Sequence, residues 1–286
     1  FMLKKYLHFL PYSFLTAVAI YTWTIFSKEQ TFQSIVKMLF MMPFETLLLC
    51  NTGIVHTKYI GWLWYLSAMV IALPVVLYLL KYHSKMFQHY LVWVVPLFIY
   101  GYLTSTVGIV WAIQFFLGNF RALAGLMLGT SLVYVTHFIK YYHITAGMKA
   151  FLTVLELSTM SAAFYYCKIV SLAASSYDII FILLVYISLA ITLSGKTWTS
   201  CIHGKVFSFL GKISLPIYCI HPLTYRIIRY FIPDASREMQ LILTTVGAFV
   251  AACLMQAIVD HIILPLAKVV RAKAEACREP ELVQSK

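Results

Sequence analysis

The sequence predicts an all-α integral membrane protein, a polytopic helical bundle of about eight transmembrane helices. Of its 286 residues, 62% are hydrophobic and only 11% are charged, whereas a soluble domain carries about 25% charged residues. The chain therefore has too little polar surface to cover a water-facing globule. Apolar stretches recur along it, and most approach the roughly 20 residues that a membrane span requires.

About eight stretches fit the length of a span when the chain is followed from its first residue. In order, they are Phe9–Phe26, Ile60–Leu80, Gln88–Tyr102, Leu117–Phe138, Ala150–Cys167, Tyr177–Ser194, Val206–Ile232 and Leu241–Val269. The apolar stretch Ser34–Leu49 is shorter and contains Lys37, Pro43 and Glu45. We therefore predict that it forms a helix that lies at the interface or dips into the membrane.

The basic residues between the predicted spans indicate the orientation of the chain. Lys and Arg fall into two sets that alternate at every crossing, and one set is about twice as large as the other. The positive-inside rule places the larger set in the cytoplasm. We therefore expect both ends on the cytoplasmic side, with residues 1–270 as a single transmembrane domain and residues 271–286 as a cytoplasmic tail.

The net charge of +12 raises the question of nucleic-acid binding. A nucleic-acid binder gathers Lys and Arg on one exposed face or along one helix, but here they stand in short groups between apolar runs, as topology determinants do. The six Cys form no CxxC pair, and the nine His form no HExxH motif. We therefore expect no nucleic-acid partner, no disulfide framework, no metal site and no tightly bound cofactor.

The stretch KISLPIYCIHP, residues Lys212–Pro222, places a histidine inside a predicted span. On a helix, five polar positions with spacings of four, three, four and four residues align in one stripe. These positions are Ser214, Tyr218, His221, Tyr225 and Arg229. A polar stripe within lipid has to face the protein interior or a wet cleft, so we predict that this helix borders a polar site.

Two prolines interrupt the same helix. Pro216 and Pro222 lack amide hydrogens, which frees the carbonyls four residues earlier, at Lys212 and Tyr218. Such a break is tolerated in a span only where the helix lines protein or water. A lone histidine more often packs in a core, but imidazole exchanges a proton near neutral pH. With four polar companions on its face, His221 is better explained by a functional role.

Three other predicted spans also contain charged residues, which are costly in lipid. Arg121 either reaches the headgroups from the outer end of its span or points inward, as a cation suited to a phosphate or a carboxylate. We interpret Glu156 as interfacial. Asp260 and His261 are expected to have a structural role, in which they pair with another helix.

Three motifs together resemble the membrane-bound acyltransferase 3 family. WLWYLSAMVIALPVVLYLL (Trp62–Leu80) looks like one of its spans, FRALAGLMLGTSLVYV (Phe120–Val135) is similar to its lRglagFllG segment, and FSFLGKISLPIYCIHPL resembles its late-span signature. Their order and spacing fit the family over most of the chain. The opening FMLKKYLHFLP is similar to the basic loop before the family's third span, with Lys4 and Lys5 near its arginines and His8 at the later one.

The resemblance implies a bacterial inner-membrane enzyme of about ten spans. Members transfer an acyl group, commonly acetyl from acetyl-CoA, to a hydroxyl of a carbohydrate bound for the cell surface or of its lipid-linked precursor. The resemblance also implies that two spans precede this chain, one of which carries an Arg and a His that serve in catalysis. The chain is then N-terminally incomplete. Its activity by itself, its acceptor, its acyl chain and its oligomeric state are left open.

Acyl transfer from a thioester requires a base for the acceptor hydroxyl, donors for the developing oxyanion and cations for the phosphates of the donor. We assign the catalytic role to His221, which can position the acceptor or shuttle a proton. Residues expected to bind the acceptor are Tyr218, Tyr225, Arg121, Trp64 and Ser214, and those expected to bind acetyl-CoA are Lys4, Lys5 and Lys212. Interfacial anchoring explains Trp64 equally well, and topology alone explains the lysines.

Two other classes of protein fit the same residues. A polytopic carrier that flips or exports a glycan or lipid would also have a bent helix and inward-facing charges, but it would leave no covalent ester. A scaffold subunit of an envelope-assembly complex would tolerate the replacement of His221 by Ala. In every case the lipid bilayer is a partner.

Overall fold

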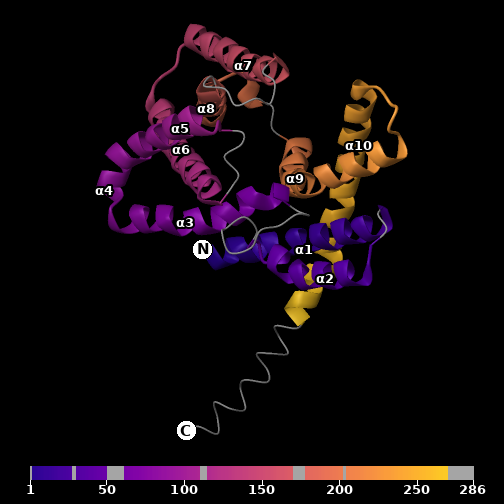
Figure 1. Ribbon diagram of the computed structural model, residues 1–286. Helices are drawn as coiled ribbons and strands as arrows, with labels where there is room; N and C mark the ends of the chain where they lie inside the picture. Colours follow the sequence, from indigo (N-terminus) through magenta and orange to yellow (C-terminus); the bar gives the residue numbers. More distant parts are fainter. Residues whose placement is uncertain are drawn as a thin grey trace, which may run out of the picture. The chain divides into compact units, whose positions relative to one another are not determined.

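The computed structural model describes residues 2–27, 30–49, 61–109, 115–169, 178–201 and 204–269 (Figure 1). Helices and their connections account for these residues, and no strand occurs among them. The predicted all-α class is thereby confirmed. The predicted cytoplasmic tail, residues 271–286, lies outside the described residues.

Long apolar helices dominate the described part of the chain. The α-helices are α1 (Met2–Ser27), α2 (Phe32–Thr46), α3 (Trp64–Tyr82), α4 (Ser84–Met86), α5 (Val92–Thr106), α6 (Phe115–Tyr141), α7 (Ala146–Ile169), α8 (Asp178–Ser194), α9 (Lys205–Phe231) and α10 (Arg237–Ile258). Shorter 3₁₀ or π turns are η1 (Gly61–Leu63), η2 (Phe87–Leu91), η3 (Thr199–Cys201) and η4 (Val259–Ile263). Seven described helical stretches are long and apolar enough to cross a membrane, and the eighth predicted span forms α8, with 17 residues. The protein is a multi-pass membrane protein.

Two compact units make up the described chain. The terminal unit contains α1, α2, α9 from Ser208 onward, α10 and η4. The central unit contains the elements from η1 to η3.

In the terminal unit, α2 returns only part of the way along α1. The hydroxyl of Ser13, in the middle of α1, donates to the backbone carbonyl of Glu45 in the last turn of α2. The Glu45 side chain is fully buried, and the hydroxyl of Tyr21 donates to its Oε2 atom at 2.8 Å. The residues Met2–Leu10, which the family resemblance places in a loop, are instead the first turns of α1. Their Leu and Lys residues favour helix.

Contacts along α1 fix the directions of its other neighbours in the terminal unit. Near the end of α1, the ring of Trp23 packs edge-on against Tyr230, close to the end of α9. Nearer its start, the hydroxyl of Tyr12 donates to Gln256, close to the end of α10. Lys212, near the start of α9, lines a cavity with Tyr12 and pairs with Asp260, just after α10. Helix α9 therefore runs parallel to α1, and α10 runs antiparallel to both. The start of α1, the start of α9 and the end of α10 meet on one side of the unit.

In the central unit, α6 packs against α3, α5 and α8. Ala68 and Ala72 of α3 and Ala122 of α6 are buried together, and such small side chains let the backbones of two membrane helices approach closely. This close contact matters for function because Arg121 precedes Ala122, and Trp64 is the first residue of α3.

Glu156 of α7 anchors the segment that follows α8. Its side chain is 5% exposed, its Oε1 atom accepts a hydrogen bond from Thr192 at 2.7 Å, and its Oε2 atom accepts one from Thr199 at 2.5 Å. The backbone amide of Trp198 also donates to Thr153 of the same helix. A carboxylate that the sequence placed at the membrane interface is thus buried, and it holds the connection between α8 and α9 against α7.

We expect Glu156→Ala to destabilise the protein, because two hydroxyl groups lose a charged acceptor and each such hydrogen bond contributes about 1.5–3 kcal/mol. Thermal unfolding in detergent, followed by circular dichroism, should show a midpoint lowered by several degrees. The matched control is Asp234→Ala, which removes an exposed carboxylate from the loop before α10. An unchanged midpoint for Glu156→Ala would contradict the anchoring role.

Candidate functional site

A cavity of about 250 Å³ lies between α1, α9 and the end of α10 in the terminal unit. Its polar lining consists of His8, Tyr12, Lys212, Gln256 and Asp260. This volume holds several water molecules at about 30 Å³ each, or a small polar part of a ligand. Two cavities of the central unit, between α7 and α8 and between α5, α6 and α8, have almost entirely apolar linings. The cavity of the terminal unit is therefore the better candidate for polar chemistry.

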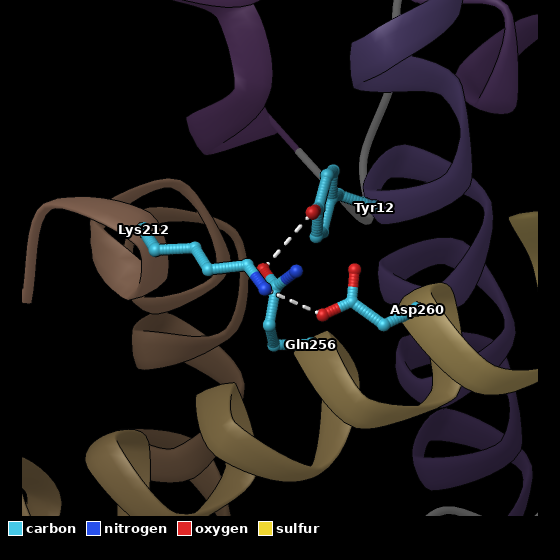
Figure 2. A network of polar contacts seen from close by, with 4 residues as sticks. All are labelled: Tyr12, Lys212, Gln256 and Asp260. Atoms are coloured by element: carbon cyan, nitrogen blue, oxygen red, sulfur yellow. Dashed lines mark hydrogen bonds and ion pairs between the residues drawn. The ribbon is translucent and has the colours of Figure 1, made fainter. Parts of the chain in front are cut away.

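The polar groups of this cavity form a connected network (Figure 2). Lys212 Nζ lies 2.7 Å from Asp260 Oδ2, and Tyr12 donates its hydroxyl hydrogen to Gln256 Oε1 at 3.0 Å. The Gln256 side chain also interacts with the carboxylate of Asp260. Because its oxygen accepts from Tyr12, its amide hydrogens are the groups that can face Asp260. Three helices that are far apart in sequence thus share one polar network, and Asp260 pairs with another helix as predicted.

The backbone around Asp260 departs from regular α-helix. Asp260 lies in η4, a π-helical turn that follows α10 and precedes Pro265. Pro265 has no amide hydrogen to offer the carbonyl four residues earlier, and a wider turn accommodates this loss. Such π turns are rare and occur frequently at functional sites.

The local structure around His221 explains why a histidine stands before a proline. Pro222 has no amide hydrogen for the carbonyl of Tyr218, and His221 Nδ1 lies 3.0 Å from that same oxygen. A carbonyl only accepts hydrogen bonds, so we assign the ring proton to Nδ1, and Nε2 then carries the lone pair of the neutral imidazole. The imidazole thereby replaces the hydrogen bond that the proline removes, and its basic nitrogen points away from the helix backbone.

The predicted polar stripe lies on one side of α9, opposite its buried side. Ser214, His221 and Tyr225 are exposed, and Tyr218 is half-buried, with its ring 6.2 Å from that of His221. The buried residues of α9 include Ile213, Pro216, Cys219, Ile220 and Leu223. The stripe is therefore not packed within the core of the terminal unit, and its side chains are accessible to a ligand.

In the central unit, two residues predicted to bind the acceptor are brought together. The guanidinium of Arg121 lies over the ring of Trp64, 4.9 Å from its centroid. Arg121 also interacts electrostatically with the hydroxyl groups of Tyr65 and Tyr100. Both hydroxyls approach Gly125, one turn after Arg121. A planar cation, an indole and two phenols are thus grouped where α3, α5 and α6 meet.

Lys4 and Lys5, predicted to bind the donor, are exposed in the first turns of α1. They precede His8 by four and three positions, a spacing that places all three on one side of a helix. Since His8 lines the cavity, the two lysines extend its basic lining toward the start of α1.

Sequence reasoning did not assign a role to Tyr12 or Gln256. A signal was present, because His8 and Tyr12 are four residues apart, as are Gln256 and Asp260. Polar residues that repeat at this spacing within apolar helices share one face. In the described part of the chain, no group of three His, Cys, Asp or Glu side chains could hold a metal ion.

Comparison with known proteins agrees with the motifs of the sequence. The model of the acyltransferase 3 family, described as an acyltransferase domain, matches residues 1–259. No curated protein and no solved structure matches the chain. The family match covers the polar stripe, the Arg121–Trp64 pair and the cavity lining up to Val259, so that Asp260 and Leu264 follow directly after it. The chain belongs to the acyltransferase 3 family of membrane proteins.

Proposed function

We propose that the protein transfers an acetyl or short acyl group from acyl-CoA to a hydroxyl of a cell-surface carbohydrate or of its lipid-linked precursor. The observation that carries this proposal is the geometry of α9. Within a chain of the acyltransferase 3 family, this helix places a cation that lines a cavity and an accessible imidazole at two depths of one membrane span.

The donor is the ligand that fits the basic lining of the cavity. Coenzyme A carries several phosphates, and Lys binds phosphate as a compact point charge. Lys212 lines the cavity, and Lys4 and Lys5 lie one turn before His8 on α1. By the positive-inside rule this side is cytoplasmic, which is where acetyl-CoA occurs. We accordingly place the protein in the bacterial cytoplasmic membrane with both ends of this chain in the cytoplasm.

Lys212, which lines the cavity, and His221 lie on opposite sides of α9, because nine positions correspond to about two and a half turns. Residues three positions apart on a helix are neighbours and form a ridge that winds around its axis. Starting from Lys212, this ridge passes Leu215, which also lines the cavity, and then Tyr218 before it reaches His221. A donor with its phosphates at Lys212 would have to pass half-way around α9 along this ridge to present its acyl group near the imidazole.

His221 then acts as the general base of the transfer. Nε2 accepts the proton of the acceptor hydroxyl while the hydroxyl oxygen attacks the thioester carbonyl. The C–S bond breaks, an ester forms, and the proton moves from the imidazole to the departing thiolate. Ser214, Tyr218 and Tyr225 are exposed or half-buried on the same side of α9 and offer hydroxyl groups to the reacting oxygens or to the acceptor.

The acceptor is expected to use the Arg121–Trp64 pair of the central unit. An indole ring offers a flat apolar surface on which a sugar ring stacks. The guanidinium binds a phosphate or carboxylate through paired hydrogen bonds. This combination suits a carbohydrate that carries a negative charge or a lipid-linked phosphate.

A transfer assay tests the proposed role of His221. In inverted membrane vesicles that contain the full-length protein and receive labelled acetyl-CoA, wild type should produce alkali-labile label on glycan. His221→Asn should reduce it at least about tenfold, because general acid–base catalysis contributes 10²–10⁴-fold. The Asn amide can still donate to the Tyr218 carbonyl, so this variant should remain folded.

The matched control is His137→Ala, which removes an exposed histidine from α6. Full transfer by His221→Asn would show that this histidine only replaces the missing proline hydrogen bond. Absence of label from well-inserted wild type would favour a carrier or a different donor over the proposed enzyme.

Another prediction tests the basic start of α1. The double variant Lys4→Ala, Lys5→Ala should raise KM for acetyl-CoA about two- to fivefold per lysine, because an exposed ion pair contributes about 0.5–1 kcal/mol. kcat should change little, and the effect should shrink at high salt, which screens exposed charges. The control is Lys85→Ala, Lys140→Ala, which removes two exposed lysines of the central unit. Equal KM values for the two double variants would contradict donor binding by Lys4 and Lys5.

A further prediction tests the acceptor site. Trp64→Leu should lower the label on glycan about five- to thirtyfold at limiting acceptor, which corresponds to 1–2 kcal/mol. Hydrolysis of acetyl-CoA in the absence of acceptor should be unchanged. The control is Trp198→Leu, which removes an exposed indole next to η3. If Trp64→Leu lowers hydrolysis and transfer equally, Trp64 supports the fold and does not bind the acceptor.

A further inference from the structure

The ion pair between Lys212 and Asp260 is more exposed to water than a pair that stabilises the fold would be. Lys212 and Asp260 lie within the segments that cross the membrane, yet their side chains are 56% and 31% exposed. Charged groups in a span face a water-filled space or a partner. Since both residues line the cavity, the pair borders water at its opening. A water-exposed ion pair contributes little stability, so its partners can be exchanged at small cost.

Asp260 keeps a partner when Lys212 leaves. The Gln256 side chain interacts with its carboxylate, and Gln256 is held by the Tyr12 hydroxyl at 3.0 Å. Tyr12 and Gln256 are both buried, so this part of the network is fixed. Lys212 is different, since it reaches Asp260 through a flexible four-carbon chain from another helix (Figure 2). The network is therefore rigid on the carboxylate side and adjustable on the cation side.

The surroundings of Lys212 favour an anion as the competing partner. His8 lines the same cavity, and Lys4 and Lys5 lie one turn before it on the same side of α1. Among the polar residues of the cavity lining, Asp260 is the one with a negative charge. An incoming phosphate would thus meet several basic groups and one carboxylate. That carboxylate, of Asp260, already forms an ion pair with Lys212 at 2.7 Å.

We propose that Lys212 and Asp260 form an exchangeable counter-ion pair, in which Asp260 holds Lys212 across the empty cavity and a phosphate of the ligand takes its place. Asp260 then acts against ligand binding and keeps the cavity closed to weakly bound anions. The identity of the ligand as an acyl-CoA rests on the proposed function, but the exchange itself requires only a phosphate-bearing anion.

This proposal predicts opposite effects for the two members of one ion pair. Binding of adenosine 3′,5′-bisphosphate and of inorganic diphosphate would be measured by titration calorimetry on the full-length protein in nanodiscs. Lys212→Met should weaken binding about tenfold, because a charge-assisted hydrogen bond is lost. Asp260→Asn should strengthen it about two- to fivefold, because the competing carboxylate becomes neutral. Lys268→Ala, an exposed cation beyond the cavity lining, should have no effect.

A purely structural ion pair would behave differently. Both variants would then weaken binding together and lower the thermal midpoint, and either this result or equal affinities for wild type and Asp260→Asn would overturn the proposal. The outcome is separable from the proposed function. Opposite shifts in binding without transfer from acetyl-CoA would support the exchange and reject the enzyme as proposed. Transfer with no opposite shifts would reject the exchange alone.

Discussion

The physical constraint on which this structure depends is that a polar group within the apolar layer must have a partner. Helices satisfy most backbone groups internally, and prolines within the spans break that rule at single positions. At Pro222 the ring of His221 supplies the missing hydrogen bond. A residue needed to repair the backbone is thereby held in one ring orientation and one tautomer. The repair and the proposed catalysis use the two different nitrogens of the same imidazole.

The same constraint explains which parts of the fold could be predicted from the sequence. The spans were predictable, because their length and apolar composition are local properties. The stripe on α9 was predictable too, because residues of one helix have fixed angular positions. The burial of Glu156 was not predictable, since its partners Thr192 and Thr199 come from later in the chain and no local pattern indicates them.

The candidate site shows the same division between local and tertiary information. Arg121, Trp64, Lys212 and Asp260 were each singled out by type and place in the sequence, but which of them pair was not predicted. Lys212 and Asp260 are separated by 48 positions, and Tyr12 and Gln256 by 244. Which helices pair depends on the packing of small side chains such as Ala68 and Ala122, and that packing is a property of the folded unit. The roles assigned to these residues remain predictions.

The spacing of functional groups along α9 bears on the choice of donor. Lys212 and His221 are nine positions apart, which corresponds to a rise of about 13.5 Å and to about two and a half turns, so the two side chains leave α9 on opposite sides. A small acyl phosphate could not bind Lys212 through its phosphate and also place its carbonyl at His221. A donor with a long arm between its phosphates and its thioester can do both, and coenzyme A has such an arm. This spacing supports the proposed acyl-CoA donor over a small activated acid, and the proposed path of its arm passes half-way around α9 along Leu215 and Tyr218.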